Sequence, residues 1–171
     1  MRKIGFVAVL LVSVLLLAGC GQDAFKAEVP KDLEAVKLAR EVVAGGYGLL
    51  NHTELKALVD SGEDMVIVDA MPLEDSYVKQ HVPGAVQFLF PIGAMETWDT
   101  AETAGKTEAE YEALLGPDKN RRVVVYCGFV KCGRSHNAAI WAKKRGYTNV
   151  QRFPGGIFAW KGAGYEVATG Q

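Results

Sequence analysis

Four short strand-like runs, two of them rich in β-branched residues, constrain the fold of this chain more than any other feature. The clearest is the Met-Val-Ile-Val run at residues 65–68, which is typical of a strand buried on both faces. The other runs are residues 85–89, 123–126 and 150–153. Segments with helical periodicity separate the runs, and this alternation predicts a parallel sheet covered by helices, an α/β fold.

The intervening segments predict helices with recognisable ends. Residues 32–44 form an amphipathic pattern that Asp32 can cap and that Gly45 and Gly46 end. Further helices are expected at residues 53–61, 107–115 and 135–144.

A long connection at residues 90–106 interrupts the alternation of strands and helices. It contains Trp98, which either packs on the core or lines a functional site. The sequence leaves both interpretations open.

The first twenty residues have the pattern of an export signal. Arg2 and Lys3 precede an apolar run at residues 4–18, which is shorter than the roughly 20 residues that a spanning helix needs. The run ends in Leu17-Ala18-Gly19-Cys20, which resembles a bacterial lipobox, in which the cysteine is acylated, for example with palmitate, and becomes the first residue. This resemblance implies an extracytoplasmic protein of the cell envelope, anchored to a membrane through Cys20 and periplasmic in a Gram-negative cell.

These boundaries divide the chain into a signal peptide at 1–19, a lipidated tether at 20–31, an N-terminal helix at 32–46 and one domain at 47–171. A chain of 171 residues has room for one such domain but not two of ordinary size. The formal net charge of −1 provides no basic surface, so no nucleic-acid partner is expected. The oligomeric state is left open.

The strongest candidate for chemistry is Cys127, which directly follows the most apolar strand. Ligands of open α/β sheets bind at the carboxyl ends of the strands, and the helix after Cys127 begins near Ser135. The positive end of that helix and the unpaired N–H groups of the loop favour a thiolate. Lys131 and Arg134 add positive charge that should lower the thiol pKa and attract an anion.

The loop after Cys127 is predicted to bind the substrate. Its glycines allow successive N–H groups to converge on an anion. The loop residues are Gly128, Phe129, Val130, Lys131, Cys132, Gly133, Arg134 and Ser135. Cys127 could instead be an inert buried thiol. Cys132 could be a resolving thiol, a disulfide partner or a spacer in the loop wall, and an exported location permits a disulfide.

Several separated segments match one known family in order and spacing. These segments are Thr53-Glu54-Leu55-Lys56-Ala57-Leu58, Val66-Ile67-Val68-Asp69-Ala70, His81-Val82-Pro83-Gly84-Ala85, Val125-Tyr126-Cys127, Arg134-Ser135, Gly146-Tyr147-Thr148-Asn149-Val150 and Gly155-Gly156-Ile157-Phe158-Ala159-Trp160. Together they resemble the rhodanese family over residues 48–167. The resemblance implies a three-layer sandwich with a central parallel sheet flanked by helices.

The resemblance also implies a sulfurtransferase that works in two half-reactions. The Cys127 thiolate would take sulfane sulfur from thiosulfate or a similar anionic donor as a persulfide and pass it to a thiol or cyanide acceptor. Two features depart from the family pattern: Met71 stands where an arginine is common, and Arg134 follows Cys127 by seven residues rather than five.

Other functions remain as alternatives. Cys127 and Cys132 could cycle between dithiol and disulfide as a redox module. The protein could also bind sulfur compounds without chemistry, or act as a phosphatase, for which the arginine spacing is wrong. Cys127, Cys132 and His136 offer three soft ligands without an evident fourth, so neither a metal ion nor a cofactor is expected.

Overall fold

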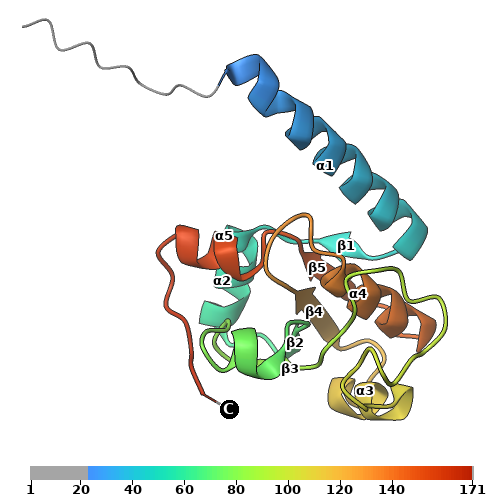
Figure 1. The fold of residues 1–171 in the computed structure, drawn as a ribbon. Helices are drawn as coiled ribbons and strands as arrows, with labels where there is room; N and C mark the ends of the chain where they lie inside the picture. Colours follow the sequence, from blue (N-terminus) through green and yellow to red (C-terminus); the bar gives the residue numbers. More distant parts are fainter. Residues whose placement is uncertain (1–22, 171) are drawn as a thin grey trace, which may run out of the picture.

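The computed structural model describes residues 23–170, and its centre is a five-stranded sheet in the order β1-β5-β4-β2-β3 (Figure 1). All four strand pairings are parallel. The strands are β1 (Gly48–Leu49), β2 (Met65–Asp69), β3 (Ala85–Gln87), β4 (Arg122–Tyr126) and β5 (Val150–Phe153). The predicted α/β class and the four predicted strands are confirmed, and the short edge strand β1 is an addition. The predicted signal peptide and Cys20 lie outside the described residues.

Alternate residues of the central strands build two apolar layers. Val66 and Val68 of β2 point into one core with Val123 and Val125 of β4, whereas Ile67 points into the opposite core. The central strands β2 and β4 are buried on both faces because helices cover both sides, as continuous apolar runs predict.

The helices cover the sheet in two layers. Side chains of α3 and α4 fill the first core, and those of α2 and α5 fill the second. Their bounds are α2 (His52–Ser61), α3 (Glu108–Leu115), α4 (Arg134–Lys144) and α5 (Gly156–Gly162), with a short π-helical turn η1 (Leu73–Tyr77) before β3. The expected three-layer sandwich is therefore confirmed. Asn51 and Thr107 each begin a capping box, which explains where α2 and α3 start.

The N-terminal helix α1 (Ala24–Gly45) begins eight residues before the expected Asp32. Asp23 caps it, because its carboxylate accepts the Phe25 N–H at 3.0 Å. The helix continues through Pro30 and ends at Gly46 in the left-handed conformation. Residues 24–31, expected as part of a tether, are thus helical.

No residue of α1 is buried, and the N-terminal part of the helix extends away from the domain (Figure 1). Over residues 23–170, no helix combines the length and apolarity needed to cross a membrane.

The long connection at residues 90–106 packs on the first core. Trp98 meets Trp141 edge-on at 5.1 Å between ring centroids, and its indole N–H donates to the Lys106 carbonyl at 3.0 Å. Asn137 of α4 fixes the start of the connection, since its amide donates to the Pro91 carbonyl at 2.8 Å and accepts the Met95 N–H at 3.1 Å. Trp98 therefore has a packing role.

Candidate functional site

Cys127 lies at the carboxyl end of β4, where α5 covers the first turn of the loop. The N–H of Ile157 donates to the Cys127 carbonyl at 3.0 Å, and the N–H of Phe158 donates to the Gly128 carbonyl at 3.0 Å. Gly156 permits this close approach: its φ is +58°, and a Cβ there would lie 2.2 Å from the Cys127 carbonyl oxygen. The first two loop carbonyls therefore face α5.

The Cys127 sulfur lies inside the loop, between a hydroxyl at the start of α4 and a loop carbonyl. Its Sγ is 3.1 Å from Ser135 Oγ and 3.5 Å from the Cys132 carbonyl oxygen. Cys127 is fully buried and Cys132 is 8% exposed, and both are free thiols. The longer loop thus brings the second cysteine beside the first.

The two thiols have opposite tendencies to ionise. Burial, together with the hydrogen bond to Cys132, raises the pKa of Cys127. The same hydrogen bond, with backbone N–H groups of Arg134 and Gly128, lowers the pKa of Cys132 to about 6. The pKa of Cys127, which the loop charges were expected to lower, is therefore raised, and Cys132 is the more acidic of the two thiols.

Arg152 of β5 is a site residue that the sequence analysis missed. Its side chain is fully buried; Nε donates to Ser135 Oγ at 2.9 Å and Nη2 donates to the Cys132 carbonyl at 2.9 Å. Nη1 pairs with Glu41 of α1 at 2.5 Å. The available signal was an arginine within a run predicted to be a strand of the sheet, because a buried charge requires a partner.

Lys131 and Arg134, both expected to hold an anion, contact other groups. Lys131 Nζ pairs with Glu34 of α1 at 3.0 Å, and the Lys131 carbonyl accepts from Lys37 at 3.3 Å. Arg134 donates to the carbonyl of Phe90. The structure brings the cysteines and Ser135 together but directs these two cations outward.

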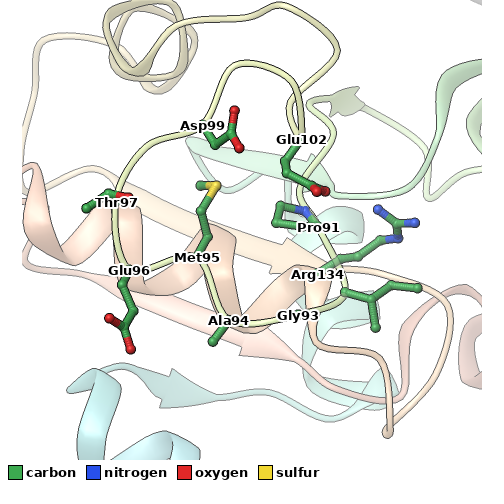
Figure 2. A pocket seen from close by; sticks show the side chains of 10 residues that line it. Pro91, Gly93, Ala94, Met95, Glu96, Thr97, Asp99, Glu102 and Arg134 are labelled. Atoms are coloured by element: carbon green, nitrogen blue, oxygen red, sulfur yellow. The ribbon is translucent and has the colours of Figure 1, made fainter.

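Arg134 lines a cavity of about 680 Å³ formed with the long connection (Figure 2). Glu96, Asp99 and Glu102 also line it, and neither cysteine does. The connection seats on Gly133, where a Cβ would lie 2.1 Å from the Ile92 carbonyl oxygen. The long connection thus packs against the cysteine loop at Gly133.

The remaining loop residues form the outer wall of the site. Phe129 is 44% exposed and contacts Phe158, which is 60% exposed, at 5.4 Å between ring centroids. Val130 offers its carbonyl to Arg152 at 3.5 Å. Met71 lies against Gly128, so a thioether occupies the position where the family often has arginine.

A cysteine at the carboxyl end of a central parallel strand, followed by a loop and the start of a helix, defines the class of α/β domains with a cysteine loop. Within that class, the Rhodanese-like domain model matches residues 51–163, and the chain belongs to this family. The match begins after α1 and contains both cysteines. No curated protein matches the chain.

Solved structures share the fold. A thiosulfate sulfurtransferase from Pseudomonas aeruginosa is 27% identical, with a TM-score of 0.58 over 81% of this chain and 22% of its own. A protein from Bacillus halodurans is 18% identical, with a TM-score of 0.57 over 79% of this chain and 86% of its own. A polysulfide-sulfur transferase homodimer from Wolinella succinogenes is 15% identical, with a TM-score of 0.54 over 81% of this chain and 91% of its own.

Proposed function

We propose that this protein is a sulfurtransferase that carries sulfane sulfur as a persulfide on Cys127. The observation that carries the proposal is the position of the Cys127 sulfur, 3.1 Å from the Ser135 hydroxyl at the start of α4 and beside Cys132. A helix N-terminus and a hydroxyl both stabilise a sulfur anion. The likeness to the Pseudomonas enzyme supports the same chemistry.

Cys132 supplies the base for the first half-reaction. Because its pKa is about 6, it is a thiolate at pH 7 and takes the proton of Cys127 as the Cys127 sulfur attacks the outer sulfur of thiosulfate. The bond between the two sulfurs of thiosulfate breaks, and sulfite leaves with that electron pair. The products are the Cys127 persulfide anion, the Cys132 thiol and sulfite, so protons and charge balance.

The donor is an anion, and the loop provides its binding groups. Backbone N–H groups between Phe129 and Lys131 bind the donor oxygens. In the second half-reaction a thiol or cyanide attacks the outer sulfur of the persulfide and restores the Cys127 thiolate, which predicts ping-pong kinetics.

We also propose that the protein works on the outer side of a membrane, anchored by a lipid on Cys20. The lipobox-like sequence at residues 17–20 supports this location. An anchored enzyme would meet small anionic donors and thiol acceptors of the cell envelope.

A dithiol–disulfide redox module is the second candidate function. The position of Cys132 favours it, because the Cys127 sulfur lies 3.5 Å from the Cys132 carbonyl oxygen and both residues are free thiols. In this alternative a disulfide would form between Cys127 and Cys132 on oxidation.

Intact-mass measurement of the domain from residue 23 onward, before and after thiosulfate, tests the proposal. A gain of one sulfur atom, mapped by peptide mass to Cys127, is expected. A loss of two hydrogens without added sulfur would favour the redox module. An unchanged mass with thiosulfate and with polysulfide would overturn the sulfur transfer, and an unchanged mass after treatment with a disulfide oxidant would overturn the redox module.

A further inference from the structure

The family model begins at residue 51, yet helix α1 before it makes three contacts with the cysteine site. Glu34 pairs with Lys131 at 3.0 Å and Lys37 donates to the Lys131 carbonyl at 3.3 Å, both at the surface. The third contact is partly buried: Glu41, whose side chain is 13% exposed, pairs with the fully buried guanidinium of Arg152. Only this last contact leads on to the sulfur atoms.

Arg152 limits the directions that the hydrogen bonds around Cys127 can take. A guanidinium can only donate, so Ser135 Oγ accepts the Arg152 Nε–H at 2.9 Å. The single hydroxyl hydrogen of Ser135 is then free to point at Cys127 Sγ, 3.1 Å away. Arg152 thus occupies one acceptor position of Ser135 Oγ and favours Ser135 as the donor to the sulfur.

Arg152 also fixes the second cysteine. Nη2 donates to the Cys132 carbonyl at 2.9 Å, the same carbonyl that lies 3.5 Å from Cys127 Sγ. One planar group therefore sets the position of Cys132 and the orientation of Ser135 together. A lysine could keep the charge but could not make both bonds with the same geometry.

We propose that Arg152 is a positioning residue for the cysteine pair, and that α1, through Glu41, is part of the active site. The inference deepens the proposed sulfur transfer and rests on it for the identity of the substrate. Its physical content is that Arg152 acts on Cys127 through the Ser135 hydroxyl. Without Arg152, Ser135 can rotate and instead accept a hydrogen bond, and the thiolate on Cys127 loses a donor.

The test measures how fast iodoacetamide alkylates Cys127 and Cys132 as a function of pH, with each site quantified by peptide mass. Other ionisable or charged groups around the pair are Lys37, Glu41, Tyr47, Asp69, Arg134 and His136. All of them remain in Arg152→Met and in Ser135→Ala. Each of these variants is expected to slow alkylation of Cys127 at pH 7 by about tenfold, the equivalent of about one pKa unit.

The double variant decides whether the two residues act as one unit. Arg152→Met combined with Ser135→Ala should alkylate at about the rate of the slower single variant. Rates that fall by the product of the two single effects would overturn the proposal. Arg152→Lys should recover little of the loss. Arg121→Met is the matched control, because Arg121 pairs with the exposed Asp64 and should leave the rates unchanged.

Glu41→Gln tests the part played by α1 and keeps the proposal testable if Arg152→Met does not fold. It leaves the guanidinium in place but weakens its anchor, so Cys127 alkylation should slow in the same direction by about threefold. A folded Glu41→Gln protein with unchanged alkylation would exclude α1 from the site. These readouts need no sulfur donor, so a failed sulfur transfer and a failed positioning role are separable.

Discussion

Arg152 and Ser135 lie 17 positions apart in the chain, and the Arg152 Nε–H donates to the Ser135 hydroxyl at 2.9 Å inside the protein. The bond joins the end of β5 to the start of α4, and Ser135 in turn contacts Cys127. The Arg152 guanidinium of β5, the strand beside β4, is therefore part of the cysteine site. The two cations predicted for the loop, Lys131 and Arg134, point elsewhere.

Cys127→Ser is expected to abolish persulfide formation. The hydroxyl that replaces the thiol is a far weaker nucleophile towards sulfur, and the loop geometry should be retained. Intact mass after thiosulfate treatment measures the result. A Cys127→Ser protein that still gains a sulfur atom, mapped to Cys132, would transfer the carrier role to Cys132.

Cys132→Ser is expected to slow sulfur uptake and to shift its pH dependence. The variant lacks the base whose pKa is about 6, so Cys127 must ionise unaided, and burial, the largest cause of its raised pKa, remains after Cys132 is replaced. At pH 7 the rate should fall by about 100-fold and should rise with pH well beyond 8. Full turnover at pH 7 would show that Cys132 is neither base nor redox partner.

Asp69 should make the stability of the protein decrease between about pH 4 and pH 6. Burial raises the pKa of this carboxyl to about 6, and its Oδ2 has no hydrogen-bond partner among the described residues. The folded state therefore binds a proton that the unfolded state has already released. Stability is highest below this window and falls by up to about 3 kcal/mol as pH rises through it.

Urea unfolding at several pH values measures this effect. Asp69→Asn should remove the decrease, whereas Asp75→Asn, on an exposed side chain, should keep it. A wild-type protein whose stability rises steadily from pH 4 to pH 6 would contradict the raised pKa.

Gly133→Ala should destabilise the fold by about 2–4 kcal/mol, because the Ile92 backbone would have to shift to make room for the methyl group. The added methyl would lie 2.1 Å from the Ile92 carbonyl oxygen. Gly93→Ala is the matched control, since nothing lies within 4 Å of a Cβ there. The midpoint of urea unfolding reports both, and equal midpoints for the two variants would disprove the close contact.

Cys20→Ser should release the protein from membranes. If Cys20 carries the lipid, the wild-type protein incorporates labelled palmitate and partitions with membranes, and the variant does neither. Detergent phase partitioning of cell extracts measures this. Equal partitioning of both proteins would place the anchor elsewhere or remove it.

The sequence by itself determined the α/β class, four of the five strands and the position of Cys127. Continuous β-branched runs such as residues 65–68 form strands buried on both faces, and capping residues such as Thr107 begin helices, so local patterns were enough. The same patterns placed the helix of residues 135–144 directly after the cysteine loop. Its start was predicted to within one residue.

Only the tertiary structure decided which groups surround the two sulfurs. Spacing alone put Lys131 and Arg134 near Cys127, but salt bridging with α1 and packing of the long connection turned their side chains outward. Arg152 came to the site because β5 pairs beside β4 in the parallel sheet, a contact between residues far apart in sequence. Local patterns do not encode such pairings, so the identity of the buried cation depended on the fold.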